Sequence, residues 1–452
     1  MMRLLLLLVA LKREAMGLQM TMSQGTPLEA KPVANKKQER RRIVSGSDFL
    51  RSESSFSESE RAAVDKRMLA EMKSSLLEEM KTSTYETTRG VGNAAVTFRL
   101  AEEYGLCWGA VRSIELALAA TEKFPDKTKH ITNELLHNPG VNKMLKDSGV
   151  EFVEKTSDGG KNFDNVKPGD VVILPAFGAT LAEMQYFDSL GVTTVDTTCP
   201  WVSKVWNVVD RQVSKEMTTI IHGKYAHEEA IATASFCDDY LIVKDLTEAE
   251  WVCNYILKKD DDPEFTKDTF LKKFAKAMSP GFDPDVHLKK IGIANQTTMY
   301  KRETAAIGKL FEKTMIRKYP EDASERFAAF DTICDATQER QDAITDMIED
   351  EKVKDLDFIL VVGGFDSSNT AHLVEIPHAK GLSVFHINEA SCIHADNSLT
   401  HRLLNGDIVT QQSWLPTDRP IKIGVTSGAS TPDAYVQEAL EKIVLLKAAI
   451  SN

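Results

Sequence analysis

Short apolar segments alternate along the chain with longer segments of helical periodicity. The apolar segments span residues 171–174, 218–221, 240–243, 291–294, 358–362 and 421–425. Such alternation is typical of α/β units built on parallel sheets. Most of these segments end in small or turn-forming residues before a helix, as in Val361-Val362-Gly363-Gly364. We therefore predict an α/β fold whose functional loops lie at the carboxyl ends of the strands.

The first 90 residues do not follow this pattern. Residues 1–44 contain nine Lys and Arg side chains and three acidic ones, in a chain that is otherwise acidic. The apolar run 4–11 after Arg3 resembles a short signal-type segment, and the basic stretch behind it resembles a transit peptide. We interpret residues 1–44 as a targeting leader, with a disordered leader as the alternative. Residues 45–90 are predicted to form an N-terminal extension with a helix from Glu58 to Lys81.

Length and charge exclude several classes of protein. A chain of 452 residues corresponds to about three domain-sized units. Lys and Arg total 55 against 67 Asp and Glu, and the net charge of −12 opposes nucleic-acid binding. No apolar run approaches the roughly 20 residues that span a bilayer. We expect no membrane span in the mature protein.

Three of the six cysteines, Cys107, Cys199 and Cys334, are predicted to lie between a strand and a helix. Pro200 follows Cys199 directly and fits the first position of a helix. At a helix N-terminus the dipole and the free N–H groups favour a thiolate. The other cysteines, Cys237, Cys253 and Cys392, lack this context, and we interpret them as small buried hydrophobic residues.

The spacing of the three cysteines places one in each third of the body. We predict three α/β units: residues 91–195 with Cys107, residues 196–330 with Cys199 and a peripheral insertion near 258–286, and residues 331–452 with Cys334. Three protein ligands leave a metal site with an open position. Thiolates also hold iron–sulfur clusters, and a 4Fe-4S cluster on three cysteines would keep one iron free to bind a substrate oxygen as a Lewis acid.

Four loops are rich in hydrogen-bond donors, at residues 134–139, 222–229, 294–298 and 363–369. Together they would form an anion site suited to phosphate or diphosphate. Taken singly, Ser367 and Ser368 could instead be a helix N-cap, and His137 and His227 could be local hydrogen-bonding residues. Glu229 is a candidate proton carrier, because a buried carboxyl with a shifted pKa can deliver protons near neutral pH. A solvated helix start is the alternative for Glu229.

The combined motifs resemble the LytB/IspH family of 4-hydroxy-3-methylbut-2-enyl diphosphate reductases, most closely its plant and cyanobacterial branch. The resemblance runs from about Tyr85 to Lys447. It rests on Tyr-Gly-Leu-Cys107-Trp-Gly, Glu-Leu-Leu-His137-Asn-Pro, Asp-Thr-Thr-Cys199-Pro-Trp, His227-Glu-Glu229, Asn-Gln-Thr297-Thr298, Asp-Thr-Ile-Cys334-Asp-Ala-Thr-Gln-Glu-Arg, Ser367-Ser368-Asn369 and Thr-Ser-Gly-Ala-Ser430. It implies a trefoil of three pseudo-symmetric α/β units with parallel sheets around a central iron–sulfur cluster.

The resemblance also implies a role for each matching residue. Cys107, Cys199 and Cys334 would hold a 4Fe-4S cluster with one open iron. Glu229 would relay protons to the substrate hydroxyl, and Thr297 would help to position it. The remaining substrate contacts would come from His137, His227, Thr298, Ser367, Ser368, Asn369 and Ser430.

The family reaction is a two-electron, two-proton reductive dehydration that yields isopentenyl and dimethylallyl diphosphate, the last step of the non-mevalonate pathway. Ferredoxin or a similar carrier would supply the electrons. The basic leader suggests import into a plastid. Two alternatives remain at this point: another enzyme with a three-cysteine cluster, such as quinolinate synthase, or a metal-binding scaffold without catalysis.

One position departs from the family pattern. Pro175-Ala176-Phe177-Gly178 stands where many bacterial members have Ser-Ala-His-Gly. One imidazole contact to the diphosphate is therefore missing at Phe177. Lys224 or neighbouring N–H groups are candidates to compensate for it.

Overall fold

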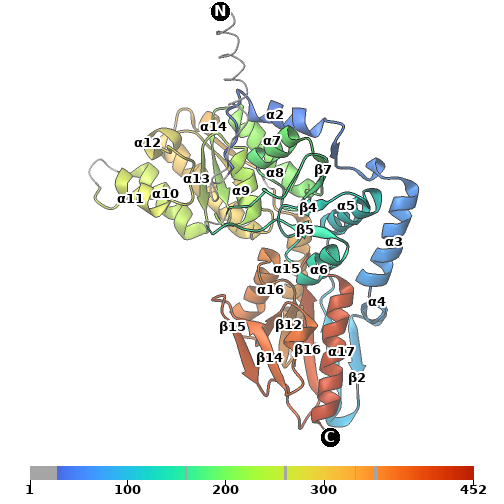
Figure 1. Ribbon diagram of the computed structural model, residues 1–452. Coiled ribbons are helices and arrows are strands. Elements are labelled where there is room, and N and C mark those ends of the chain that lie inside the picture. Colours follow the sequence, from blue (N-terminus) through green and yellow to red (C-terminus); the bar gives the residue numbers. More distant parts are fainter. Residues whose placement is uncertain (1–27, 158–159, 259–261, 331, 351–354, 452) are drawn as a thin grey trace, which may run out of the picture.

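The computed structural model describes residues 28–157, 160–258, 262–330, 332–350 and 355–451. Its described residues form three sheets, each with at least four parallel strands and flanked by helices (Figure 1). The predicted signal-type run 4–11 lies outside the described residues. Within them, no helix combines the length and the apolar character needed to cross a membrane.

The first sheet has the strand order β1-β7-β6-β4-β5. Its strands are β1 (Phe49–Leu50), β4 (Lys129–Ile131), β5 (Val150–Phe152), β6 (Val171–Leu174) and β7 (Thr193–Asp196). The second sheet has the order β11-β10-β8-β9. Its strands are β8 (Thr218–His222), β9 (Tyr240–Val243), β10 (Ile291–Asn295) and β11 (Phe327–Ala329). Neighbouring strands in both sheets run parallel.

The third sheet has the order β15-β14-β13-β12-β16-β3-β2. Its parallel core consists of β3 (Val96–Leu100), β12 (Phe358–Val362), β13 (Val384–Ile387) and β16 (Ile421–Ser427). Antiparallel strands extend both edges: β2 (Glu86–Arg89) on one side, and β14 (Ser398–Arg402) with β15 (Ile408–Gln412) on the other.

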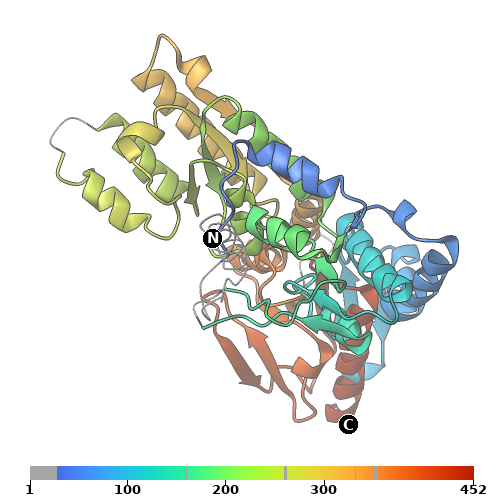
Figure 2. The ribbon, with the colours of Figure 1, turned by 45° about the horizontal axis from the view of Figure 1, so that its top comes forward.

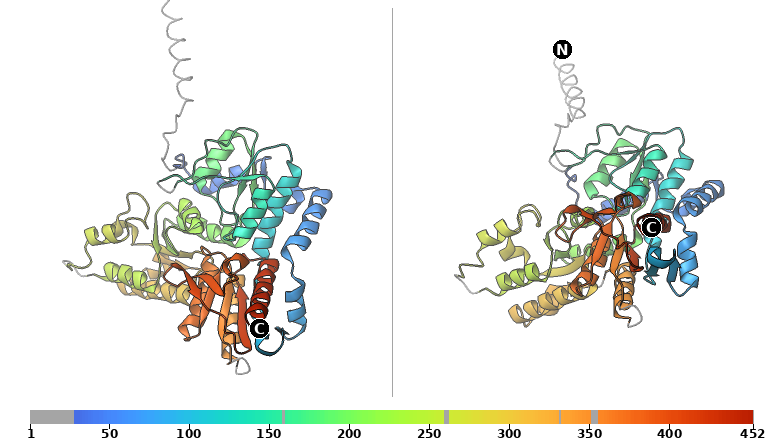
Figure 3. Two further views of the ribbon diagram at one scale, coloured as in Figure 1. Left: turned by 60° about the horizontal axis from the view of Figure 1, so that its bottom comes forward. Right: turned by 90° about the horizontal axis from the view of Figure 1, so that it is seen from below.

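The three parallel cores repeat one arrangement. In each, one strand (β7, β11 or β3) leads into a cysteine and a helix, and it pairs with an equivalent neighbour (β6, β10 or β16). In the first sheet, the short strand β1 adds to the outer side of β7. The helices are α8 (Pro200–Val213), α15 (Asp335–Glu349) and α5 (Trp108–Lys123). The predicted trefoil of three pseudo-symmetric α/β units is confirmed, and Figures 2 and 3 show the three lobes meeting at the centre.

The sheets join segments that the predicted boundaries separate, and the pairing of β3 is the clearest case. Strand β3 lies within the predicted unit 91–195 but pairs with β16, with Val96 opposite Ile421. The third unit therefore receives its fourth parallel strand from the part of the chain that precedes the first unit. Cys107 consequently follows a strand of the third sheet, and α5 then leads the chain into the first unit.

The N-terminal region packs on the body. Helix α2 (Lys36–Val44), in the predicted leader, lies against α7 (Leu181–Leu190), and Arg40 of α2 forms a 2.8 Å ion pair with Asp210 of α8. The helix predicted over residues 58–81 is two helices, α3 (Glu58–Met72) and α4 (Ser75–Thr82). They separate at Ser74, because its side chain accepts a hydrogen bond from the Leu77 N–H at 3.0 Å and caps the second helix.

The remaining helices connect or cover the sheets. They are α6 (Pro139–Asp147), α9 (Glu228–Ser235), α10 (Leu246–Leu257), α11 (Lys267–Lys273), α12 (Pro284–His287), α13 (Lys301–Lys318), α14 (Ala323–Arg326), α16 (Ser368–Ala379) and α17 (Asp433–Ile450). Helices α11 and α12 fall in the predicted insertion and lie at the edge of the molecule in Figure 1. Phe270 in α11 and Phe274 at the end of α11 are both buried beside Trp251 of α10.

Candidate active site

The predicted site residues lie on equivalent loops of the three units, at the carboxyl ends of parallel strands. The loops after β4, β8 and β12 carry His137, then His227 with Glu229, and then Ser367 with its two neighbours. The loops after β6, β10 and β16 carry Phe177, Thr297 and Ser430. This is the edge at which open α/β sheets bind ligands.

Each of the three cysteines is the N-cap of its helix, as the sequence predicts. The backbone N–H groups of the three cysteines donate equivalent hydrogen bonds to the loops after β16, β6 and β10. The N–H of Cys107 donates to the Ala429 carbonyl at 3.0 Å, that of Cys199 to Ala176 at 3.0 Å, and that of Cys334 to Thr297 at 3.2 Å. A carbonyl of one strand loop therefore fixes the start of each cysteine helix.

The thiols of Cys107 and Cys199 lie close together beside Gly109. A β-carbon on Gly109 would stand 2.6 Å from Cys199 Sγ and 3.9 Å from Cys107 Sγ. Burial, with a smaller contribution from the neighbouring cysteines, raises the pKa of Cys199 to about 12 and that of Cys334 to about 11. The thiols would therefore lose their protons only to a bound cation.

The three thiols form a donor set of the kind that holds an iron–sulfur centre, because thiolates are the ligands of such centres. Among the described residues, no three His, Cys, Asp or Glu side chains stand together in a way that would hold a single metal ion. Cys199 Sγ lies where a β-carbon of residue 109 would stand, so glycine at this position lets the thiol approach α5 and Cys107.

Glu229 is buried in the first turn of α9 and is held by Thr297. The N–H of Thr297 donates to Oε1 of Glu229 at 2.6 Å, and its hydroxyl donates to Oε2 at 3.1 Å. Burial raises the pKa of Glu229 to about 7, although both hydrogen bonds from Thr297 favour the charged form. The carboxyl can therefore gain and lose a proton near neutral pH.

His227 and His137 lie beside each other, with Phe177 packed against both. The His137 and His227 ring centroids are 5.4 Å apart, and the Phe177 ring stacks on His137 at 4.4 Å. Nδ1 of His227 accepts the Glu229 N–H at 3.1 Å, which leaves its Nε2 to carry the ring proton. Burial lowers the pKa of His227 to about 3, so this imidazole is a neutral donor.

Three predicted substrate contacts have buried polar atoms with no hydrogen-bond partner among the described residues. These atoms are Nε2 of His137, Oγ of Ser368 and Nδ2 of Asn369. The other ends of two of these side chains are fixed, because Nδ1 of His137 bonds Glu134 at 3.0 Å and Oδ1 of Asn369 accepts the Ala429 N–H at 2.9 Å. Buried polar atoms without partners are costly, so this set fits a polar ligand.

The other predicted contacts, Ser367, Ser430 and Thr298, form hydrogen bonds within the protein. Ser367 caps α16 by accepting the Thr370 N–H at 3.2 Å, and Ser430 donates to the His137 carbonyl at 3.2 Å. Thr298 accepts a hydrogen bond from Gln296 at 2.8 Å. Gly364 allows the loops of the first and third units to meet, since a β-carbon there would fall 1.9 Å from the His137 carbonyl oxygen.

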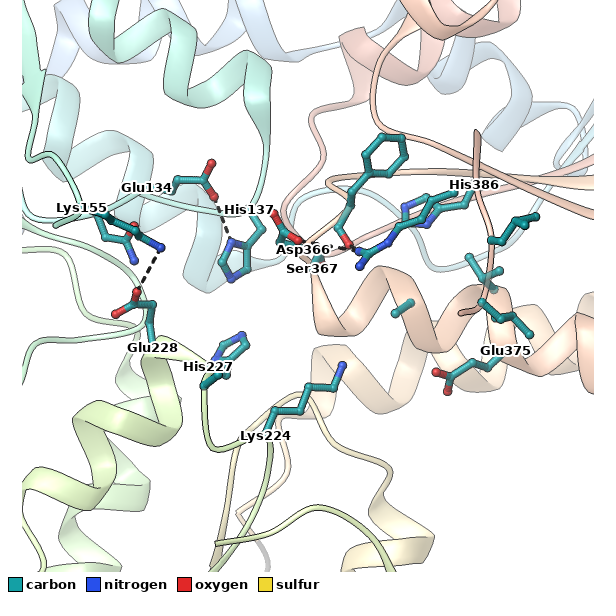
Figure 4. Close-up of a pocket in the computed structure, with 18 residues that line it drawn as sticks. Glu134, His137, Lys155, Lys224, His227, Glu228, Asp366, Ser367, Glu375 and His386 are labelled. Carbon is teal, nitrogen blue, oxygen red and sulfur yellow. Dashed lines mark hydrogen bonds and ion pairs between the residues drawn. The ribbon is translucent and has the colours of Figure 1, made fainter. Parts of the chain in front are cut away.

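A pocket of about 550 Å³ opens between the three units, with His137, His227 and Ser367 on its wall (Figure 4). Several of its charged residues carry no role in the sequence analysis: Glu134, Lys155, Glu228, Asp366, Glu375, His386 and Arg402. Glu134 lies three residues before His137, a spacing at which side chains can meet, and this signal was available in the sequence. Arg402 comes from the β14 edge strand, and no local signal links it to the site.

Arg340 belongs to the Cys334 motif, but the motif does not indicate what Arg340 does. Its buried guanidinium donates to the carbonyls of Tyr104 at 3.2 Å and Gly105 at 2.8 Å. Arg340 belongs to α15, which starts after Cys334, and residues 104–105 precede Cys107. Arg340 therefore joins two of the three cysteine segments.

Comparison with known proteins agrees with this geometry. Residues 98–444 match the profile of the family described as LytB protein. The chain is 50% identical over 382 residues to 4-hydroxy-3-methylbut-2-enyl diphosphate reductase of Picosynechococcus sp., which covers 84% of this chain and 91% of that protein. It is 53% identical over 352 residues to the chloroplastic reductase of that name from Botryococcus braunii, covering 77% of this chain and 69% of that one.

A solved structure shares the fold. The E-1-hydroxy-2-methyl-but-2-enyl-4-diphosphate reductase from Plasmodium falciparum superimposes with a TM-score of 0.54 at 22% identity, covering 76% of this chain and 86% of that one.

Proposed function

This chain belongs to the LytB family, and from that premise we propose that it is a 4-hydroxy-3-methylbut-2-enyl diphosphate reductase. Two electrons and two protons convert the substrate into isopentenyl or dimethylallyl diphosphate and one water. The C–O bond to the terminal hydroxyl breaks, and a C–H bond forms on the allylic carbons. The observation that carries the proposal is the convergence of three N-cap cysteines with a buried carboxyl held by Thr297.

An iron–sulfur cofactor accompanies the family activity, and we propose a 4Fe-4S cluster on Cys107, Cys199 and Cys334. When bound, this group supplies electrons and a Lewis-acidic iron for the substrate oxygen. The protein fixes the three thiols through helix starts whose N–H groups are already bonded to neighbouring loops. Gly109, which has no β-carbon, leaves room for Cys199 Sγ.

The diphosphate binds among the buried donors of the first, second and third units. Nε2–H of His227 and the unpartnered atoms of His137, Ser368 and Asn369 are proposed to meet its oxygens. Ser367, Thr298 and Ser430 complete the proposed contacts. Binding the remote end of the substrate in this way lets binding energy orient the reacting C–O bond.

Glu229 is the proposed acid that protonates the leaving hydroxyl of the substrate. Its pKa of about 7 lets the neutral carboxylic acid deliver a proton to the leaving hydroxyl and be reprotonated. Thr297 holds the carboxyl through its N–H and its hydroxyl, and the Thr297 carbonyl accepts the Cys334 N–H. The acid is therefore fixed relative to one of the three cysteine segments.

The electron donor is proposed to be ferredoxin or a similar one-electron carrier, and the proposed compartment is a plastid. Trp108, which directly follows Cys107, is 63% exposed, so the path from the surface to this thiol is short. The chloroplastic name of the Botryococcus braunii relative supports the plastid assignment.

The function is tested under anaerobic conditions with the whole chain after iron–sulfur reconstitution. Addition of 4-hydroxy-3-methylbut-2-enyl diphosphate should cause oxidation of a reduced viologen dye, followed by its absorbance. Cys107→Ser should abolish this oxidation, whereas Cys237→Ser, a change at a buried thiol outside the site, should retain it. A loaded cluster without substrate-dependent oxidation would reject the proposed substrate, and zinc in place of iron would favour a scaffold.

A further inference from the structure

The pocket between the three units contains a lysine without a counter-ion. Lys224 lies in the loop after β8 and lines the pocket wall. In Figure 4 its side chain extends into the pocket from the same loop as His227. Among the described residues, no carboxylate lies within 4.0 Å of its ammonium, and no hydrogen bond from that ammonium is seen.

The carboxylates that line the pocket are each engaged elsewhere. Every one of them has a basic side chain within ion-pair distance. The pairs are Glu134 with His137 at 3.0 Å, Glu228 with Lys161 at 3.5 Å and Lys155 at 3.7 Å, Asp366 with Arg402 at 3.8 Å, and Glu375 with His372 at 2.8 Å. The charge distribution of the pocket therefore leaves the Lys224 ammonium available for a bound anion.

The backbone of Lys224 is fixed independently of its side chain. Its N–H donates to Oε1 of Gln296 at 3.1 Å, and its carbonyl accepts the His227 N–H at 2.9 Å. Burial lowers the pKa of the ammonium, and the more distant Glu375 opposes this shift. The half-buried position means that an anion would meet this charge with little screening from water.

Phe177 lies beside the proposed ligand site but cannot neutralise an anion. Its ring packs on His137 at 4.4 Å and against the edge of His227 at 5.8 Å, so it lies where a side chain could reach the same ligand. A phenyl ring offers neither a positive charge nor an N–H donor. His227 is neutral, as its pKa of about 3 shows, and cannot supply the charge either.

We infer that Lys224 is the cation that neutralises the substrate diphosphate in this chain, in the role that an imidazole at position 177 would otherwise fill. The inference rests on the proposed function, because it assumes a diphosphate ligand. It adds a substrate-binding residue that orients the substrate by its remote end and leaves the proton transfer to Glu229. Lys224 and an imidazole at position 177 are predicted to be interchangeable in this role.

The test measures binding without turnover. Isothermal titration calorimetry of the reconstituted full-length protein uses isopentenyl diphosphate as the probe, at pH 6 and pH 8. Lys224→Met should weaken binding about tenfold to a hundredfold, the range for losing a hydrogen bond between charged groups. Lys224→Arg should bind within about threefold of the parent, since it keeps the charge.

The matched control is Lys244→Met. Lys244 is exposed, lies outside the pocket and is close enough to act on Lys224 electrostatically, so its removal changes the net charge in the same way. Binding should change by less than about twofold, because exposed charges are screened. Equal losses in Lys224→Met and Lys244→Met would overturn the inference in favour of a general field effect.

The rescue variant combines Lys224→Met with Phe177→His. The double variant should recover part of the lost affinity at both pH values, because the new imidazole supplies an N–H donor even where burial keeps it neutral, as it does for His227. Unchanged affinity in Lys224→Met would overturn the inference and leave the proposed function standing. Failure of the parent protein to bind the probe would reject the proposed function itself. Melting temperature and cluster absorbance establish that each variant is folded and loaded.

Discussion

The carboxyl of Glu229 is bound at both oxygens by a single residue, Thr297. The backbone N–H meets Oε1 at 2.6 Å and the hydroxyl meets Oε2 at 3.1 Å. The Thr297 carbonyl in turn accepts the N–H of Cys334 at 3.2 Å. One residue of the β10 loop therefore sets the position of the proposed acid relative to a proposed cluster ligand.

Replacing Glu229 with Gln should separate proton delivery from assembly of the site. The amide oxygen can still accept the Thr297 N–H, but the side chain can no longer supply a proton. We expect turnover to fall by about 10² to 10⁴, the usual contribution of a general acid. Iron content and visible absorbance should match those of the parent. Turnover within a few-fold of the parent would remove Glu229 from the proton-transfer step.

The pH dependence of turnover should report the same group. The active form is the neutral acid, and burial raises its pKa to about 7. The rate should therefore be highest below pH 7 and should fall about tenfold per unit above it, as the carboxyl loses its proton. Steady-state rates from pH 5.5 to 9 with a pH-insensitive electron donor measure this decrease. The decrease should be absent in Glu229→Gln. If the decrease persists in that variant, a group other than Glu229 causes it.

Gly109→Ala should impair cluster assembly. The new β-carbon would stand 2.6 Å from Cys199 Sγ, closer than any normal contact, so the thiol must move. We expect iron and sulfide per chain to drop by at least half after reconstitution, as measured by colorimetric assay. Gly308→Ala, in helix α13, is the matched control, because the nearest atom to a β-carbon there is that of Ala329 in β11, 3.9 Å away. Full loading of Gly109→Ala would show that this space is not needed.

Phe177→His should alter substrate binding more than cluster assembly. The substitution adds an imidazole next to His137 and His227, within the proposed diphosphate subsite, and it leaves in place the Ala176 carbonyl that accepts the Cys199 N–H. We expect a lower KM, because the new imidazole offers an N–H donor to the diphosphate, with visible absorbance unchanged. A variant that assembles no cluster would contradict this assignment and would show that the phenyl ring is needed for folding of the site.

Local sequence determined the start of each cysteine helix and the composition of the neighbouring loops. Pro200 after Cys199 favours a first helical turn, and an apolar strand ends shortly before it. Such signals act over a few residues, so they are visible without knowledge of the fold. The three N-cap cysteines and the donor-rich loops could therefore be predicted from the sequence, and the family resemblance added their proposed roles.

The tertiary structure decided which residues share an environment. Glu229 reads equally well as a solvated helix start or as a buried acid, and only the packing of the β10 loop over α9 buries it and raises its pKa to about 7. The contact of Arg340 with the carbonyls of residues 104–105 joins segments far apart in the chain. Neither outcome has a local pattern, because each depends on burial and on a partner from another unit.

Strand pairing shows the same division. Strand β3 (Val96–Leu100) was not among the apolar segments of the sequence analysis, and nothing local indicates whether it completes the first sheet or the third. The structure pairs it with β16, since the third parallel core lacks its outer strand and the chain before the first unit supplies it. The sequence by itself determined the elements and their chemistry. The long-range pairing that closes the trefoil brought Cys107 to the other two cysteines, because a parallel strand finds its neighbour only when the whole sheet assembles.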